Sequence, residues 1–266
     1  MNSIRTIRYF INNKNKNEYL ISADNDKIVI IWDVSNNYSI KYIIDTNYED
    51  DIGSCLLVFP HIINDDYIIT STNCISNDYN ISATKIYSLT NGKYIKYINN
   101  SNNYYTCYLI DWYNKKNNNY YLIELVYRNI VINNLLINEL YCELIKEPEN
   151  FHNSGFIFNN GDNEYLCCST INGYINIWDL YNKCIFKIIN LNGCFLMHII
   201  NWNNKYIIVA DLYNKSFKII NIELEEVVSI IKQKANVVSI KKIFHPIYGE
   251  LILSASRDYT IKLWYI

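Results

Sequence analysis

Two stretches of the chain carry the same pattern and decide the fold: SADNDKIVIIWDV (Ser22–Val34) and SASRDYTIKLWYI (Ser254–Ile266). Each opens with Ser, passes through a short polar turn that contains Asp, and continues into an apolar run that includes Trp. In both stretches Ser stands ten residues and Asp six residues before the Trp. Self-similarity within one chain indicates a repeat architecture, in which each repeat forms one supersecondary unit.

The position of the Trp, here called the Trp slot, recurs along the whole chain. The steps between positions 32, 87, 133, 178, 220 and 264 are 55, 46, 45, 42 and 44 residues. Each unit contains short runs rich in Ile, Val and Tyr, separated by turns rich in Asn, Asp and Gly, which is typical of strands rather than helices. We therefore predict an all-β array of four-stranded sheets. The slots are occupied by Trp32, Tyr87, Asn133, Trp178, Ile220 and Trp264.

The segments YLCCSTINGYINIWDLYNKCIFKI (165–188) and LILSASRDYTIKLW (251–264) resemble the WD40 repeats of β-propellers. The resemblance extends over essentially the whole chain and implies a β-propeller of about six four-stranded blades. It further implies a single WD40 domain over residues 1–266, with units at about 4–45, 53–98, 104–146, 153–189, 194–231 and 237–266.

The resemblance also implies a structural core in each blade. In this family Trp in the third strand, Ser or Thr in the second, Asp in the turn between them and His before the first strand form one hydrogen-bonded set. A buried indole N–H needs such an acceptor. Carried over by offset, the set consists of Trp32, Ser22 and Asp26 in the first unit, Trp178 and His152 in the fourth, and Trp264, Ser254 and Asp258 in the last. In the fourth unit, Cys168 and Asn172 stand in the Ser and Asp positions.

The last unit contains only three predicted strands. Residues 1–3 alone precede the first strand, and the sequence stops directly after TIKLWYI (260–266), so we expect the last blade to lack its outer strand. A bare, apolar edge strand tends to pair with other chains. Three explanations remain open: the chain is a truncated product or a piece of a larger protein, a partner adds a strand by β-augmentation, or the flanking blades protect the edge.

Composition excludes several classes of function. The chain has 24 basic and 26 acidic residues, so no long-range attraction to nucleic acid or to an anionic membrane is expected. The N-terminus lacks a signal-peptide pattern, and no apolar run approaches the roughly 18 residues that a membrane span needs. The eight Cys form no CxxC pair, which predicts reduced core thiols in a cytoplasmic protein, with the nucleus as the alternative. We predict no catalytic, cofactor-binding or metal-binding residues, because no HExxH, GxGxxG or P-loop pattern occurs.

The resemblance implies a non-enzymatic scaffold that presents its loops to partner proteins or peptides. Arg257 is the foremost candidate contact, because Arg and Tyr are enriched at interaction hot spots. One alternative is a structural subunit of a larger assembly, such as a coat or pore, whose open propeller is completed by a partner strand. Another is a fragment of a larger multidomain WD40 protein. An enzyme that works in a central channel lacks a suitable cluster. The candidate face comprises Asp24, Asn25, Asn172, Tyr174, Asn214, Arg257 and Tyr259.

Overall fold

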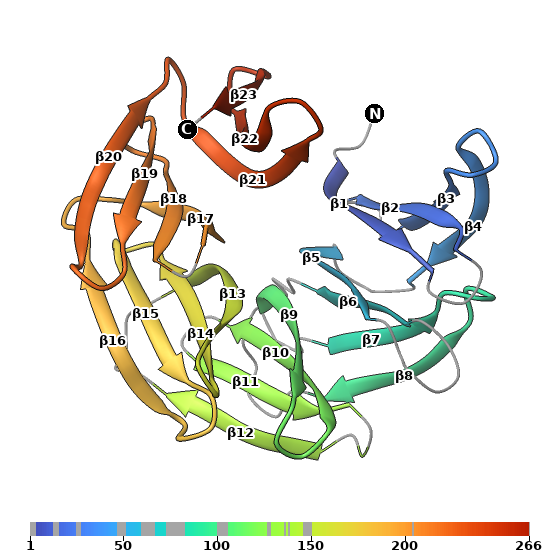
Figure 1. Ribbon diagram of the computed structural model, residues 1–266. Helices are drawn as coiled ribbons and strands as arrows, with labels where there is room; N and C mark the ends of the chain where they lie inside the picture. The colour runs from blue at the N-terminus through green and yellow to red at the C-terminus, as the bar shows by residue number, and fades with distance from the viewer. Residues whose placement is uncertain are drawn as a thin grey trace, which may run out of the picture. The chain divides into compact units, whose positions relative to one another are not determined.

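The computed structural model is all-β and divides into two compact units, residues 1–143 and 144–266 (Figure 1). It describes residues 4–12, 16–24, 28–46, 52–59, 67–72, 83–99, 106–126, 129–135, 137, 139–145, 151–203 and 205–265. These residues form strands, turns and irregular segments, with no helix among them. The division falls within strand β12, and the sheet to which β12 belongs is described with the first unit.

The first unit holds three four-stranded sheets, each with its strands in sequence order. The first sheet consists of β1 (Ile4–Ile11), β2 (Glu18–Asp24), β3 (Ile28–Asp33) and β4 (Ser39–Asp45). The second consists of β5 (Ile52–Phe59), β6 (Tyr67–Thr72), β7 (Ala83–Ser88) and β8 (Tyr94–Asn99). The third consists of β9 (Thr106–Asn114), β10 (Asn119–Val126), β11 (Asn129–Asn134) and β12 (Glu139–Ile145). Strand β5 lies beside both β1 and β9.

The second unit repeats this arrangement, but its last sheet has three strands. The fourth sheet consists of β13 (His152–Asn160), β14 (Asn163–Thr170), β15 (Tyr174–Asp179) and β16 (Cys184–Asn190). The fifth consists of β17 (Leu196–Asn201), β18 (Tyr206–Asp211), β19 (Ser216–Asn221) and β20 (Glu226–Lys232). The sixth consists of β21 (Val237–His245), β22 (Gly249–Ser256) and β23 (Ile261–Tyr265). Strand β17 lies beside both β13 and β21.

The Trp slot is a real structural repeat, as the strand registers show. In every sheet the slot residue is paired with Leu or Ile on the second strand, for example Trp178 with Leu166 and Trp264 with Ile252. In four sheets the pairing of the third and fourth strands shifts by one residue at the slot, which is the mark of a β-bulge. The slots therefore occupy equivalent positions although their residue types differ.

Apolar side chains of neighbouring sheets pack against each other and form the core. In the second unit, Phe217 of the fifth sheet and Val237 and Ile252 of the sixth belong to one cluster, and Trp264 packs against it. In the first unit, Ile31 of the first sheet and Ile68 of the second sheet belong to another hydrophobic cluster. Because strand residues alternate between faces, a strand such as β19, whose residues are all buried, is covered on both of its faces.

The fold class predicted from the sequence is confirmed: six small antiparallel sheets form the blades of a β-propeller, and the last blade has three strands. The boundaries of a single domain over 1–266 stay a prediction. The placement of all Cys in the core is wrong for Cys184, which is exposed, whereas Cys167, Cys168 and Cys194 are buried.

Candidate functional site

The Trp slot of the sixth sheet is the centre of a small hydrogen-bond network. Nε1 of Trp264 donates to Oγ of Ser254 over 2.8 Å, and Nε2 of Gln233 donates to the same oxygen over 2.9 Å. Oγ of Ser256 donates to Oε1 of Gln233 over 3.0 Å. Gln233 therefore joins the network in the unit that lacks the family's His. The comparison of residues by their spacing from the Trp missed Gln233, because only a His was sought in the segment before the first strand of this unit.

The same indole-to-serine contact is present in the first sheet but not in the fourth. Nε1 of Trp32 donates to Oγ of Ser22 over 3.1 Å. Nε1 of Trp178 is buried and has no acceptor among the described residues. Cys168 stands where the other sheets have Ser, and its sulfur hydrogen-bonds the Asn176 carbonyl oxygen at 3.6 Å. His152 is buried at the start of β13, in the same sheet.

The third sheet satisfies its slot with a different pair. Nδ2 of Asn133 donates to Oε1 of Glu124 over 2.8 Å. Glu124 is fully buried, and its other oxygen accepts from Oγ1 of Thr84 over 2.6 Å and from Oγ1 of Thr106 over 3.4 Å. By register, Glu124 lies two residues beyond the partner of the slot, which is the position of Ser254 in the sixth sheet. Asn133 and Glu124 thus replace Trp and Ser together.

The predicted turn carboxylates lie apart from these networks. Asp258 is exposed and accepts from the backbone N and Oγ1 of Thr260, over 3.2 and 2.6 Å. These hydrogen bonds, Oγ1 of Thr260 foremost, lower the pKa of Asp258. Oδ1 of Asp24 accepts from the backbone N of Ile28 over 3.2 Å. Asn25 and Asp26 lie outside the described residues.

The candidate contact residues of the fourth and fifth sheets differ in exposure and engagement. Asn172 is exposed, in the turn between β14 and β15. Tyr174 is half-buried, and its backbone N donates to Oγ1 of Thr170. Nδ2 of Asn214 donates to Oδ2 of Asp211 over 2.7 Å, which commits this side chain to its own sheet.

The turn between β22 and β23 presents the other two candidates to solvent. Arg257 is exposed, and Tyr259 is 100 % exposed with a φ of 62°, in the left-handed region. A non-glycine residue in this region carries backbone strain. No packing contact accounts for a fully exposed Tyr, so the turn displays an aromatic side chain next to a cation.

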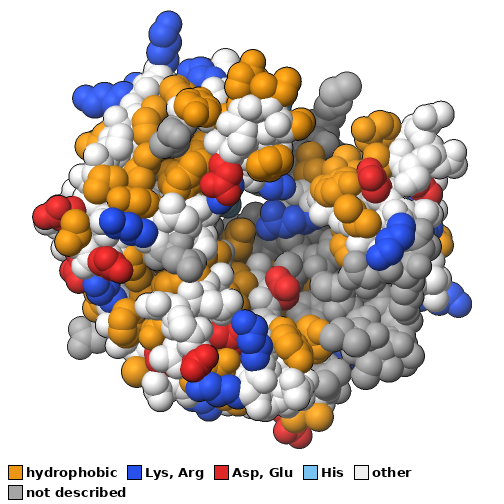
Figure 2. All heavy atoms as spheres, in the orientation of Figure 1, with side chains coloured by type: hydrophobic (Ala, Val, Ile, Leu, Met, Phe, Trp, Pro, Cys, Tyr) orange, Lys and Arg blue, Asp and Glu red, His pale blue; other side chains and the backbone are white. Residues whose placement is uncertain are grey.

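Strand β23, which follows this turn, has two unlike faces. Trp264 packs toward the fifth sheet, where its ring meets that of Phe217 edge to face with centroids 5.4 Å apart. The alternate residues Ile261, Leu263 and Tyr265 are 69, 53 and 79 % exposed. Figure 2 shows hydrophobic side chains at the surface over the sheet that Figure 1 labels β21 to β23.

One edge of β23 is open in the second unit, as far as the described residues extend. The backbone N of Ser256 donates to the carbonyl of Thr260, so this is a hydrogen-bonded pair. Hydrogen-bonded and non-bonded pairs alternate along an antiparallel ladder, which directs the amides of Lys262 and Trp264 to β22. The amides of Ile261, Leu263 and Tyr265 face the open edge.

An apolar groove lies on the face of this sheet that carries Leu263 and Tyr265. It has a volume of about 410 Å³ and is lined by Tyr248, Leu251, Leu263 and Tyr265. The open backbone edge and the groove share Leu263 and Tyr265, so both features belong to one surface. We call residues 257–265 together with Tyr248 and Leu251 the β23 surface.

Comparison with known families fits this geometry. A family model described as "WD domain, G-beta repeat" matches residues 226–265. The matched range begins at the outer strand of the fifth sheet and ends at β23 of the sixth. Residues 226–265 therefore match a WD40 repeat, within a chain whose six sheets are the blades of a β-propeller. No curated protein matches it significantly. The other five sheets are assigned as blades by the strand registers and Trp slots described above.

The described part of the chain contains no group of three or more His, Cys, Asp or Glu side chains that could hold a metal ion. It also contains no helix with the length and apolar character needed to cross a membrane. The β23 surface offers backbone hydrogen-bonding groups beside exposed apolar side chains.

Proposed function

We propose that this protein is a WD40 propeller that acts as a non-enzymatic protein-interaction scaffold and that the β23 surface is its docking site. Proteins of this fold generally act as interaction scaffolds. The observation that carries the proposal is the open edge of β23 with three outward apolar side chains. An exposed apolar edge strand is a template for another strand. The partner is a protein with an extended segment that adds to this edge.

The chemistry of the surface defines the segment that would bind. Strand addition supplies main-chain hydrogen bonds, while pockets for alternate side chains supply specificity. The groove beside Leu263 and Tyr265 is apolar, so we expect an apolar side chain at every second residue of the segment. Arg257 and Tyr259 adjoin the edge and would contact the partner residues that follow the paired segment. The thiol-rich composition favours a cytoplasmic or nuclear setting.

Two variants of Leu263 separate backbone pairing from side-chain packing. Leu263→Pro removes an amide that faces the open edge, a position at which proline is tolerated. Leu263→Lys keeps the amide but removes the apolar side chain. The matched control is Leu224→Lys, at an exposed turn residue of the neighbouring sheet.

The test uses a photo-crosslinking amino acid placed at Tyr265 of the tagged chain in cells. We expect one stoichiometric partner, crosslinked through an extended segment. Leu263→Pro should abolish the crosslink, Leu263→Lys should weaken it at least tenfold, and Leu224→Lys should leave it intact. The same probe at Phe186, which is exposed on β16, is the control site. Equal capture by all variants would refute the β23 surface as the docking site.

A second candidate function is a structural subunit of a larger assembly. The observation that favours it is the exposure of Val228 and Ile230 on β20 in addition to that of β23. An obligate subunit should aggregate alone and become soluble when coexpressed with its crosslinked partner. A scaffold with transient partners should stay monomeric alone at micromolar concentration. Sedimentation of the purified chain with and without the partner distinguishes the two.

A further inference from the structure

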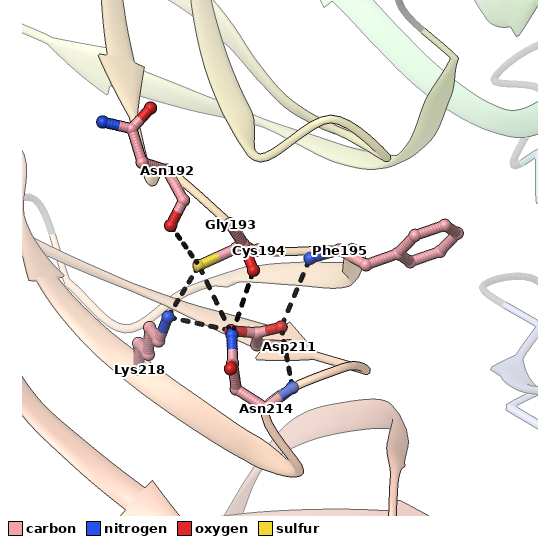
Figure 3. Close-up of polar contacts among 7 residues, drawn as sticks. All are labelled: Asn192, Gly193, Cys194, Phe195, Asp211, Asn214 and Lys218. Carbon is pink, nitrogen blue, oxygen red and sulfur yellow. Dashed lines mark hydrogen bonds and ion pairs between the residues drawn. The ribbon is translucent and has the colours of Figure 1, made fainter.

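A buried pair of thiol and amine lies in the fifth sheet, apart from the β23 surface. Nζ of Lys218 is 2.7 Å from Sγ of Cys194 and 2.8 Å from Oδ2 of Asp211. Figure 3 shows the three side chains converging, with Asn214 beside them. Cys194 is 6 % and Lys218 9 % exposed, and Asp211 is fully buried. A lysine so deeply buried needs a charge partner, which Asp211 provides.

The three groups come from three segments of the chain. Cys194 belongs to the connection between β16 and β17, Asp211 ends β18, and Lys218 lies within β19. Asn214 completes the cluster, because its Nδ2 donates to Asp211 and, over 3.2 Å, to the carbonyl of Gly193. The backbone N of Phe195 donates to Oδ1 of Asp211 over 3.3 Å. These contacts hold the sulfur and the amine in one place.

Burial and the neighbouring charges determine the protonation states of Cys194 and Lys218 before any reaction. Burial would lower the pKa of Lys218, but the hydrogen bond and charge of Asp211 outweigh it and raise the pKa. Burial raises the pKa of the Cys194 thiol. The hydrogen bond from Lys218 lowers this pKa, and Asp211 raises it further, so that the net shift is upward. At neutral pH the resting cluster is therefore a thiol, an ammonium and a carboxylate.

We propose that peroxide oxidation of Cys194 joins its sulfur covalently to Nζ of Lys218, which makes the pair a redox-sensitive cross-link. A sulfenic acid condenses readily with a neighbouring nucleophile. Here the neighbouring nitrogen, Nζ of Lys218, is hydrogen-bonded to the sulfur, and the nearest base, Asp211, is bound to the same nitrogen. The cross-link would tie the β16–β17 connection to β19.

The reaction balances with hydrogen peroxide as the oxidant. The Cys194 thiol is oxidised by two electrons to a sulfenic acid, and the peroxide is reduced to water. Asp211 then takes one proton from the Lys218 ammonium, and the freed amine attacks the sulfur. The S–N bond forms, the S–O bond breaks, and the leaving hydroxyl takes a second proton from the nitrogen to depart as water. The products are a sulfenamide, a protonated Asp211 and water.

Peptide mapping of the intact chain tests the proposal. After treatment with hydrogen peroxide, trypsin should release peptide 188–205 joined to peptide 216–232, with cleavage after Lys218 blocked. The mass should equal the sum of the two peptides less two hydrogens. A product joined through one retained oxygen, whose formation takes up a second peroxide and releases two waters, supports the same link. Dithiothreitol should restore the separate peptides.

Two variants and one internal control make the result decisive. Lys218→Arg keeps a cation beside Asp211 but removes the nucleophilic amine, and Cys194→Ser removes the sulfur. Both should fold, as circular dichroism verifies, and neither should give the joined peptide. Cys184 is exposed and has no recorded lysine contact in the described part of the chain, so it should be oxidised without a cross-link.

Thermal unfolding gives a second readout. The cross-link closes a loop between residues 194 and 218, so peroxide should raise the melting temperature of the wild-type chain by roughly 5 °C and leave that of Lys218→Arg unchanged. The proposal is overturned if Cys194 stays unmodified, or carries only oxygen without a link, under conditions that fully oxidise Cys184. It is also overturned if Lys218→Arg gives the same melting shift.

Discussion

Nδ2 of Asn133 donates to Oε1 of Glu124 across the third sheet, at the position where Trp264 donates to Ser254 in the sixth. Both contacts run from the Trp slot to the residue two places beyond its partner on the second strand. A repeat without Trp in its slot therefore has the same direction of hydrogen bond: a side-chain N–H on the third strand donates to an oxygen on the second.

A double-mutant cycle on Glu124 and Asn133 should reveal this coupling. Glu124→Ala leaves the buried Asn133, Thr84 and Thr106 with a lost partner, so we expect it to destabilise the fold by about 3 kcal/mol or more. Asn133→Ala should cost less than Glu124→Ala, because Glu124 keeps its two threonine donors. The coupling energy from urea unfolding should be about 1–3 kcal/mol. Additive effects of the two substitutions would show that the pair does not act as a unit.

Cys168→Ser should stabilise the fourth sheet. The hydroxyl would stand where Ser254 stands, donate to the Asn176 carbonyl that the thiol now contacts, and accept from Nε1 of Trp178. We expect a gain of about 0.5–1.5 kcal/mol in urea unfolding. The control is the same substitution in a Trp178→Phe background, where no N–H is available. Equal effects of Cys168→Ser in both backgrounds would contradict the predicted bond.

Gly173→Ala should be much more damaging than Gly161→Ala. Gly173 has a φ of +85°, and an added Cβ would lie 2.5 Å from the backbone oxygen of Leu191. Gly161 has a φ of +63°, but no atom lies within 4 Å of its added Cβ. We expect a loss of about 2–4 kcal/mol at Gly173 and about 1 kcal/mol at Gly161, measured by thermal unfolding. Similar losses at both positions would mean that crowding by Leu191 is unimportant.

Asp211 should make stability depend on pH below pH 4. Burial opposes the charged form, but hydrogen bonds from Lys218 and Asn214 outweigh it and lower the pKa of Asp211 in the folded state. Its contribution is therefore fully present above the unfolded pKa of about 3.9 and is lost as pH falls through the lower folded value. Asp211→Asn should flatten this acid limb in urea unfolding followed against pH. The exposed control, Asp258→Asn, should change it less.

Sequence reasoning was sufficient for the fold because the strands are short, apolar and regularly spaced. The Trp slots, the order of strands and the three-stranded last blade follow from the positions of Trp32, Trp178 and Trp264. The offset of ten residues failed for Glu124, because the segment between Glu124 and Asn133 is one residue shorter than the matching segment of the first, fourth and sixth units. An alignment of the units that allows the length of this segment to vary would have found Glu124.

The site was harder to predict because it depends on exposure and on strand edges. Arg257 and Tyr259 were identified from residue type, and both are exposed. Asn214, chosen for its place in a turn of the repeat, is bound to Asp211. The contact between Cys194 and Lys218 joins residues from different strands, and nothing in their sequence spacing indicates it. Only the packing of the fifth sheet brings the sulfur and the amine together.

Hydrogen exchange of the β23 amides, with and without the partner crosslinked at Tyr265, tests the central claim most directly. In the free chain, the amides of Ile261, Leu263 and Tyr265 should exchange faster than those of Lys262 and Trp264, which are bonded to β22. In the complex, the first three should slow at least tenfold, because a partner strand has paired with them. If these amides exchange at the same rate in the complex, β23 is not the docking edge and the account is wrong.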